Sequence, residues 1–393
     1  MSAKRRAAIV AARRTAVCPR GGALSSLQAD ELAAPVLAQL LADAGVKPGE
    51  VDHVLLGNAL YGGGNPARLA TLRAGLPSSV PALTIDSQCC SGLDAILLGA
   101  RLIESGAADC VIAGGAESFS RAPVRMKRPV SPKDDPVAYN RPPFAPPPFT
   151  DPDLAEAAAR LAADRMILRR DQAAFAVASH EKAMAARPFL AERLVRNGDC
   201  WPDQDGFTRR LPLKTALRAP LLQGDGDTGL SAATIACEAD GAALVLLRPA
   251  DILGETSAPI ITIRAGVSLG GDPADPALVP IAAARKVLNQ AGIAAADLAA
   301  IEVMEAYAVQ AMVTMADLGL DPGRINNLGG ALARGHPIGE SGAILAVNLF
   351  ERLIVQETPA EGSERHGLAL IAAAGGLGTA MLFECRSEKV DNF

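Results

Sequence analysis

Short apolar runs alternate along the chain with longer segments in which apolar residues recur every three or four positions. The short runs have the length of buried strands, and the longer segments have the period of amphipathic helices. This alternation is typical of a parallel sheet whose strands are joined by crossover helices, so the sequence predicts an α/β fold. The expected strands cover residues 7–12, 51–56, 110–113, 301–304 and 368–374, and the expected helices cover residues 32–44 and 340–355.

One apolar stretch has almost the length of a membrane span. Residues 367–383 form a run of 17 residues without a charged side chain, whereas a spanning helix needs about 20. The run contains the pair Gly375 and Gly376, which favours two buried strands joined by a glycine turn. The N-terminal segment has only six apolar residues between two basic clusters, too few for a secretory signal. We therefore expect no membrane anchor and a cytoplasmic protein.

The two ends of the chain resemble each other at a constant spacing of 247 residues. The Ala-Gly pair at residues 44–45 matches the pair at 291–292, and Val54 in the strand that follows matches Ile301. A Ser-Gly pair also opens a helix in each half. This pattern predicts a duplicated α/β half, so that equivalent loops of the two halves meet at one site across a pseudo-twofold axis.

The segment between the two halves has a different composition. Residues 129–152 contain nine prolines, which predict an extended surface loop because proline fits neither a helix interior nor a central strand. A helical segment and a glycine-rich passage follow, and we expect the whole insertion to sit on top of the first half. The expected domains are residues 1–117 with about 241–268 as the N-terminal half, 118–240 as an inserted loop domain on the coenzyme A side, and 269–393 as the C-terminal half.

Composition and charge exclude several classes of protein. The 393 residues are 49% hydrophobic, which is enough for two or three large folding units. A net charge of −5 provides no general attraction for nucleic acid or an anionic membrane. The seven cysteines show no paired spacing, so we expect neither a disulfide framework nor a metal site, and we expect a reducing compartment.

A cysteine and a histidine are the candidate chemical groups. Cys89 and Cys90 stand where an extended run meets a helix, and the partial positive charge of that helix end is expected to deprotonate a thiol near neutral pH. His336 lies between Gly335 and Pro337, which are expected to keep its backbone extended and its imidazole accessible. Because the two loops are counterparts in the duplication, we expect a Cys–His pair. The remaining histidines, His53, His180 and His366, are interpreted as surface or structural residues.

Four segments in order resemble the thiolase family, whose members make or cleave β-ketoacyl-CoA through an acyl-cysteine. These segments are NPARLATLRAGLPSSVPALTIDSQCCSGL, AGGAESFSRAP, DQAAFAVASHEKA and GGALARGHPIGESG, and the resemblance covers essentially the whole chain. It implies the thiolase fold, two duplicated halves in five αβαβα layers. It also implies Cys89 as the nucleophile, His336 as its activating base, Glu305 as a further catalytic residue, and an oxyanion hole formed by the backbone N–H groups of Cys89 and Ala374.

The chain departs from the thiolase pattern at two positions. Met304 stands where the family has an asparagine that holds an oxyanion-hole water, and Ala372 stands where the family has a second cysteine that removes and returns the substrate α-proton. A positioned general base contributes roughly 10²–10⁴ in rate, and an oxyanion donor roughly 10²–10³. We therefore expect acylation of Cys89 to persist and Claisen condensation to be weak.

The resemblance implies acyl-CoA and free coenzyme A as substrates, with no permanently bound cofactor. Ala236 stands where the family has a serine that faces the pantetheine. The resemblance also implies a homodimer or homotetramer, with the proline-rich loop at the tetramer contacts. Basic residues that could meet the nucleotide phosphates, or could equally be solvated surface residues, are Arg125, Arg128, Arg209 and Arg210.

Other functions remain open at this stage. A catalytically silent thiolase-fold scaffold or partner subunit, for example beside a small acyl-binding protein, explains both departures equally well. An acyltransferase to an acceptor other than coenzyme A is also compatible with the sequence. Decarboxylative condensation, as in ketosynthases, needs no α-proton base, but those enzymes usually present a histidine where this chain has Met304 or Ala372.

Overall fold

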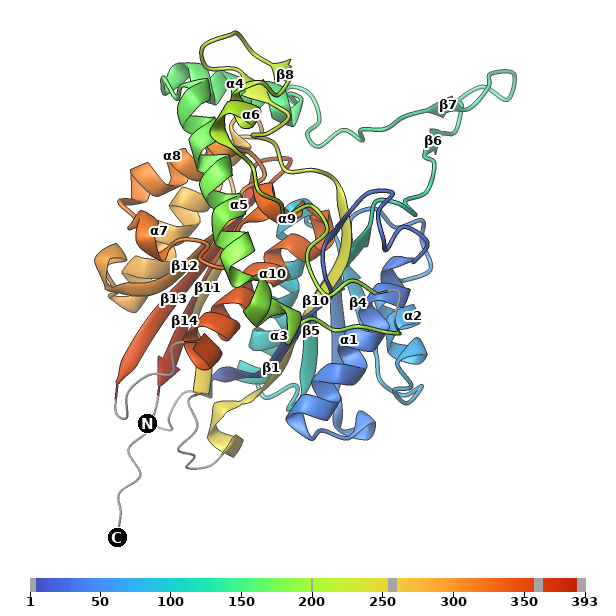
Figure 1. Ribbon diagram of the computed structural model, residues 1–393. Coiled ribbons are helices and arrows are strands. Elements are labelled where there is room, and N and C mark those ends of the chain that lie inside the picture. Colours follow the sequence, from blue (N-terminus) through green and yellow to red (C-terminus); the bar gives the residue numbers. More distant parts are fainter. Residues whose placement is uncertain (1–4, 199–200, 254–259, 357–362, 387–393) are drawn as a thin grey trace.

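A single mixed sheet runs through the molecule (Figure 1). The computed structural model describes residues 5–198, 201–253, 260–356 and 363–386. The strands lie in the order β12-β13-β14-β11-β1-β10-β5-β3-β4, and β2 pairs with β10. Their bounds are β1 Ala7–Arg14, β2 Cys18–Pro19, β3 His53–Gly57, β4 Ala82–Ile85, β5 Val111–Ser118, β10 Ala239–Pro249, β11 Ile260–Gly270, β12 Leu298–Val303, β13 Glu364–Ala373 and β14 Leu377–Arg386.

The sheet is mixed, whereas the apolar pattern predicted a parallel one. Only the pairs β3–β4, β3–β5 and β12–β13 are parallel among the described strands of this sheet. β13 and β14 form an antiparallel hairpin because the turn at residues 374–376 is too short for a crossover helix. The uncharged run at residues 367–383 is thus two buried strands joined by a glycine turn, as predicted. Within the described ranges, the structure contains no helix with the length and apolar character needed to span a bilayer.

The duplication predicted from the sequence is confirmed by the strand order. The N-terminal half contributes β4-β3-β5-β10-β1, and the C-terminal half contributes β12-β13-β14-β11 in the matching order. A single bridge between Ile301 and Ile325 marks the place of a fifth C-terminal strand. The halves join where Ala8 and Ile9 of β1 pair with β11.

One boundary predicted from the sequence is wrong. Residues 260–268 were expected to belong to the N-terminal half, but β11 pairs with β14 along its whole length and with β1 at only two positions. The strand therefore belongs to the C-terminal half. Strand-length apolar runs look alike in sequence, and only pairing tells which sheet edge a strand joins.

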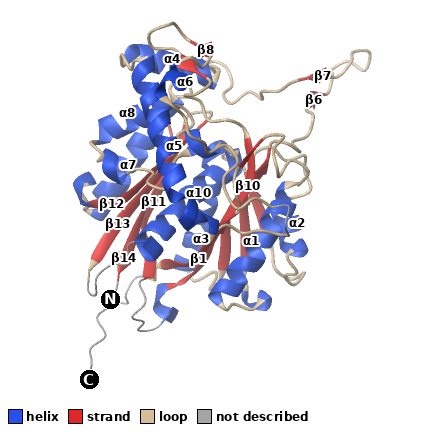
Figure 2. Ribbon diagram, in the orientation of Figure 1, coloured by secondary structure: helices blue, strands red, loops and turns tan. Residues whose placement is uncertain are grey.

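Helices separate and cover the two halves of the sheet in five layers (Figure 2). α3 and α10 lie in the middle layer, where Leu93 and Ile96 pack with Leu345 and Leu349 in one apolar cluster. α1 and α2 cover the outer face of the N-terminal half, and α7 and α8 cover that of the C-terminal half. The bounds are α1 Ala29–Ala44, α2 Pro66–Arg73, α3 Ser91–Glu104, α7 Val279–Ala291, α8 Ala308–Leu318 and α10 Ile338–Phe350.

The helices of the insertion pack on the C-terminal half, although the sequence led us to expect them on the first half. Ala158 and Ala162 of α4 (Leu154–Asp164) pack against Val309 and Val313 of α8, and α5 (Arg169–Ala191) also contacts α8. The bidentate ion pair of Arg165 with Asp317 ties the same elements together. The remaining elements of the insertion are β6 Met126–Lys127, β7 Val137–Ala138, α6 Leu213–Leu217, β8 Leu221–Gln223 and β9 Leu230–Ser231.

The proline-rich segment forms an extended arm rather than a packed layer. In Figure 1 the β6–β7 hairpin projects away from the rest of the molecule. The prediction of an extended surface loop at residues 129–152 is therefore correct. Val130 on this segment is fully exposed, and Val124, just before the segment, is 87% exposed.

Candidate active site

A sharp turn between β4 and α3 carries Cys89. The turn spans Gln88–Cys90 and leads directly into α3. Gln88 has φ +55°, a left-handed conformation that is uncommon for a residue other than glycine. The Ser91 hydroxyl donates to the Gln88 carbonyl oxygen at 2.5 Å and accepts from the Ser87 N–H at 2.9 Å. These bonds hold Cys89 at the start of the helix, while the Cys90 thiol, fully buried, faces the carbonyl of Ile371.

The second chemical group, His336, lies between α9 (Ala331–Arg334) and α10. Its Nε2 atom is 3.2 Å from the Cys89 sulfur, and its Nδ1 atom is 2.7 Å from the Ser341 hydroxyl oxygen. That hydroxyl donates its hydrogen to the Pro337 carbonyl at 2.8 Å, so it accepts from Nδ1–H. We therefore assign the proton of the neutral ring to Nδ1, which leaves the Nε2 lone pair directed at the sulfur.

The duplication brings these two side chains together. Cys89 and His336 are separated by 247 residues, the repeat spacing seen in the sequence, and each stands just before a middle-layer helix. The helix starts approach closely because small residues line the contact: a β carbon on Gly92 would lie 2.7 Å, and one on Gly115 1.9 Å, from the Gly339 carbonyl oxygen. Side chains at these glycines would force the two loops apart.

Burial decides the charge state of the pair. It raises the pKa of Cys89 to about 12, although the N–H groups of Ala374 and of Cys89 itself face the sulfur and lower it. Burial also lowers the pKa of His336 to about 4, with the nearby Arg334 acting in the same direction. Burial therefore opposes the deprotonation of Cys89 near neutral pH that the sequence predicted, because desolvation acts against the field of the helix end. The resting pair is a neutral thiol donating to a neutral imidazole.

This charge state predicts the pH dependence of alkylation. A thiol whose pKa is about 12 gains thiolate about tenfold per pH unit throughout the range from pH 6 to 9. We expect the rate of iodoacetamide labelling of Cys89, followed by peptide mass spectrometry, to rise in that proportion without levelling off. A plateau above pH 7 would show that the thiolate–imidazolium pair already exists in the free protein and would contradict the assignment.

A pocket of about 110 Å³ opens beside the pair. Its lining is mostly apolar, and its polar side chains are Cys89, His336, Tyr307 and Gln310. Apolar residues of the lining come from helix α4, from the loop before β10 and from the end of β13: Ala157, Ala158, Ala236, Ala372, Ala373 and Ala374. The structure thus places Ala236, Ala372 and Ala374, all named from the sequence, at the same pocket as Cys89.

Glu305 does not face this pocket, so its predicted catalytic role is corrected. Its carboxylate accepts hydrogen bonds from the Ser179 hydroxyl at 2.7 Å, the Asn326 amide at 2.6 Å and the Leu332 N–H at 3.2 Å. It lines a separate cavity together with Phe175 and Lys182. Glu305 therefore holds α5 and the loop before α9 in place. Met304 is also turned inward, with 1% of its surface exposed in the middle core.

The basic residues named for phosphate binding lie away from the pocket lining. Arg125 donates to the Ala59 carbonyl at the base of the arm, and Arg128 is exposed on the arm itself. Arg209 stacks on the Phe207 ring at 4.0 Å, and Arg210 is exposed next to it. None of the four lines the pocket at Cys89, so their role toward coenzyme A stays a prediction.

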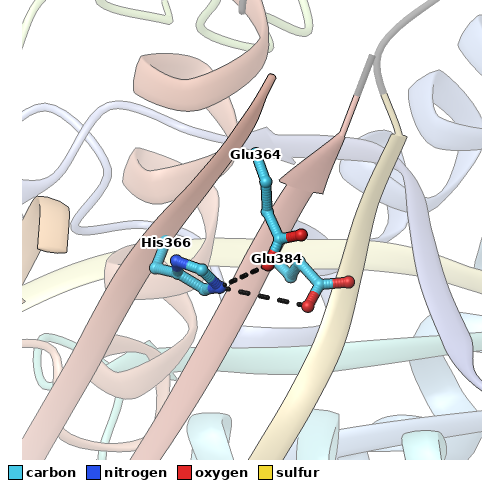
Figure 3. Close-up of side chains that lie close together, drawn as sticks. All are labelled: Glu364, His366 and Glu384. Carbon is cyan, nitrogen blue, oxygen red and sulfur yellow. Dashed lines mark ion pairs between the residues drawn. The ribbon is translucent and has the colours of Figure 1, made fainter. Parts of the chain in front are cut away.

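A cluster of three side chains has ligand types that could hold a metal ion (Figure 3). His366 Nε2 is 2.9 Å from Glu364 and 3.9 Å from Glu384. Among the described residues no other group of three such side chains lies close enough to share an ion. Arginines already pair with the two carboxylates: Arg6 and Arg264 with Glu384, and Arg386 with both. We interpret the cluster as an ion-pair network at the sheet end, which fits the structural reading of His366.

Three residues that the structure places at the site were not singled out from the sequence. Ser341 was noted only as part of a repeated Ser-Gly pair, but it orients His336. Tyr307 and Gln310 line the pocket from the start of α8. Their spacing of three residues on a helix start was the available signal, because it places both on one face.

Fold and pocket together define an α/β enzyme built from two duplicated halves, with a cysteine–histidine pair at their junction. Residues 7–194 match the family described as Thiolase, N-terminal domain, and residues 257–385 match Thiolase, C-terminal domain. The chain belongs to the thiolase family.

Similar proteins cover nearly the whole chain. An acetyl-CoA acetyltransferase of Pseudomonas aeruginosa is 36% identical over 398 residues, covering 95% of this chain and 98% of that protein. An acetyl-CoA acetyltransferase of Allochromatium vinosum is 37% identical and covers 96% and 98%. The crystal structure of the Bacillus anthracis acetyl-CoA acetyltransferase superposes with a TM-score of 0.86 at 28% identity, covering 98% of this chain and 100% of that one. The Acat5 thiolase of Ascaris suum, in complex with coenzyme A, has a TM-score of 0.85 at 27% identity and covers 96% and 99%.

Proposed function

We propose that the protein is an acyl-CoA acyltransferase of the acetyl-CoA acetyltransferase type that works through an acyl group on Cys89. The observation that carries this proposal is the 3.2 Å approach of His336 Nε2 to the Cys89 sulfur at the wall of a pocket. The names of the similar proteins support acetyl-CoA as a substrate, and the coenzyme A complex of the Ascaris suum thiolase supports a coenzyme A site.

The geometry supports acylation of Cys89 with His336 as the base. As the Cys89 sulfur attacks the thioester carbonyl carbon, the thiol proton moves to Nε2 of His336. The developing oxyanion is stabilised by backbone N–H groups of Cys89 and Ala374, both of which face the sulfur. When the carbon–sulfur bond of the substrate breaks, the proton on Nε2 passes to the departing coenzyme A thiolate. Transfer of the acyl group to an acceptor reverses these steps, with coenzyme A or another nucleophile as the acceptor.

Weak Claisen condensation is part of the proposal. Condensation needs a base that removes an α-proton from a second acyl-CoA, and the titratable side chains at the pocket are Cys89, His336 and Tyr307. Cys89 carries the acyl group at that stage, and burial lowers the pKa of His336 to about 4, which makes its imidazole a weak base for an α-proton. The pKa of Tyr307 is raised by burial, so its phenol stays protonated. Ala372 offers only a methyl group at the position where the family resemblance places a thiol.

The surface supports a homodimer or homotetramer. β4 is the last strand of the sheet, and Leu83 on this strand is 49% exposed. Beside it, Leu69 and Leu72 of α2 are 47% and 45% exposed. A bare strand edge flanked by leucines is a surface that soluble proteins normally cover. The oligomeric state and the cytoplasmic location stay predictions.

The proposed function is tested by weighing the intact protein after incubation with acetyl-CoA. We expect one acetyl adduct that is absent from Cys89→Ala and present in Cys90→Ala, since Cys90 is fully buried and faces away from the pocket. If neither acetyl-CoA nor longer acyl-CoA thioesters modify the wild-type protein, the alternative of a silent scaffold or partner subunit replaces the proposal.

A further inference from the structure

Asp94 links the turn that carries Cys89 to strands of the other half. It lies in the first turn of α3, and its carboxylate accepts from the Ser87 hydroxyl at 2.5 Å and from the Thr379 hydroxyl at 2.7 Å. Ser87 directly precedes the turn, whereas Thr379 belongs to β14 of the C-terminal half. Ser268 of β11 adds a third hydroxyl, 3.1 Å from that of Thr379. One side chain thus fastens the Cys89 turn to the C-terminal half.

The bonds to Asp94 are suited to hold an ionised carboxylate. Burial raises the pKa of Asp94, and the hydrogen bonds from the Ser87 and Thr379 hydroxyls act in the opposite direction, because they favour the charged form. Hydrogen bonds to an ionised acceptor are shorter and stronger than those between neutral groups. We therefore expect the link between the two halves to resist displacement.

The Cys89 turn needs support from outside its own residues. Gln88 has the left-handed φ of +55°, and such a conformation persists only where surrounding contacts enforce it. The bonds of the Ser91 hydroxyl and of the Asp86 carboxylate lie within the turn and its immediate neighbours. They shape the turn, but they do not fix its position relative to the C-terminal half. The bond from Ser87 to Asp94 connects it to β14.

That position matters because the two backbone donors at the sulfur come from different halves. The N–H of Cys89 belongs to the turn before α3, and the N–H of Ala374 belongs to the turn between β13 and β14. A pair of donors stabilises an oxyanion only when both lie at hydrogen-bond distance from the same point. Thr379 stands on β14, the strand that follows Ala374, so its bond to Asp94 ties the two donor-bearing segments together.

We propose that Asp94 is a positioning residue for the acylation step, which holds the backbone N–H of Cys89 in place relative to that of Ala374. This inference rests on the proposed function, because it concerns the oxyanion that forms when Cys89 attacks a thioester. It goes further in assigning a role to a residue that does not line the pocket and acts on the reaction only through the turn.

Two substitutions of Asp94 test the role of its hydrogen bonds. Asp94→Ala removes both bonds, and we expect acylation by acetyl-CoA, followed by intact mass after rapid quenching, to slow about 10-fold to 100-fold. Asp94→Asn can accept from one hydroxyl and donate to the other, so we expect a rate within about threefold of the wild-type value. An Asp94→Asn defect as large as that of Asp94→Ala would assign the effect to charge and overturn the positioning role.

Alkylation separates positioning from general damage to the site. Iodoacetamide reacts at the Cys89 sulfur without forming an oxyanion, so we expect Asp94→Ala to keep a labelling rate close to that of the wild type while its acylation slows. Ser87→Ala removes only the bond at the turn and should show the same split, which keeps the test decisive if Asp94→Ala does not fold. Parallel losses in both rates would indicate a disturbed site and would contradict the proposal.

Ser105→Ala is the matched control. Ser105 follows the other end of α3, and its hydroxyl donates to the Leu102 carbonyl of the same helix at 3.0 Å. The substitution therefore removes a hydroxyl bond at α3 without touching the link between the halves, and we expect the wild-type acylation rate. Equal losses in Ser105→Ala and Ser87→Ala would attribute the effect to the stability of α3 and would overturn the proposal.

The outcomes separate this inference from the proposed function. If acetyl-CoA acylates Asp94→Ala and the wild-type protein at the same rate, the positioning role is disproved and the acyltransferase stands. If no thioester acylates the wild-type protein, hydrogen exchange of the peptide covering residues 86–92, read by mass spectrometry, decides the question. Faster exchange in Asp94→Ala and Ser87→Ala, but not in Ser105→Ala, would support the hold on the turn; unchanged exchange would overturn it.

Discussion

Replacing His336 by glutamine is expected to slow acylation of Cys89 by about 10²–10⁴-fold. The reason is the charge state of the pair. Because burial raises the pKa of Cys89 to about 12, little thiolate exists at neutral pH, and the thiol needs a base within reach as it attacks. Among the residues that the structure describes, Nε2 of His336 provides this base at 3.2 Å from the sulfur, and a glutamine amide cannot accept the proton. Quenched-flow acylation with acetyl-CoA at pH 7, read by intact mass, measures the rate.

Two further variants test whether the slower acylation comes from loss of the base. Ser341→Ala removes the acceptor of the Nδ1 proton but leaves the imidazole in place, so we expect a smaller loss, about tenfold. His180→Gln alters a buried histidine that does not line the pocket and should leave the acylation rate near the wild-type value. The His336→Gln defect should also shrink as the pH rises toward 10, because hydroxide then generates the thiolate. A wild-type rate in His336→Gln at pH 7 would contradict the assigned base.

Replacing Ala372 by cysteine is expected to increase acetoacetyl-CoA synthesis by about 10²-fold or more. Ala372 lines the pocket at the end of β13 and is partly exposed there, so an added thiol has room beside the acyl group on Cys89. The thiol would supply the missing acceptor for the α-proton of the second acetyl-CoA. Condensation is followed by the absorbance of the acetoacetyl-CoA enolate, with acylation of Cys89 measured in parallel.

A second variant tests whether condensation depends on where the new thiol lies in the pocket. Ala158→Cys adds a thiol to the same pocket from α4, on a different wall, and we expect it to leave condensation weak. Two results would refute the explanation: vigorous condensation by the wild-type protein, or equal gains from the two variants. The first would mean that another group already removes the α-proton.

Much of the fold was accessible from local patterns. Apolar runs and helical periods located the strands β1, β3, β5, β12 and β13 and the helices α1 and α10, because burial of one face leaves a periodic trace in the chain. The repeat at 247 residues predicted that the loops of Cys89 and His336 are counterparts, and the structure places both at the start of middle-layer helices. The glycine pair at residues 375–376 likewise predicted the β13–β14 hairpin.

The identity and order of residues along this chain therefore specify the elements, their duplication and the two reactive side chains. The three-dimensional packing determines the contacts, the direction and the solvent exposure of those side chains. β11 joined the C-terminal half through strand pairing, and Glu305 turned toward Ser179 and away from the pocket. The pKa of the Cys89 thiol is raised because burial removes the sulfur from water. Pairing, side-chain direction and desolvation depend on neighbours that are distant in sequence, and local patterns contain no record of them.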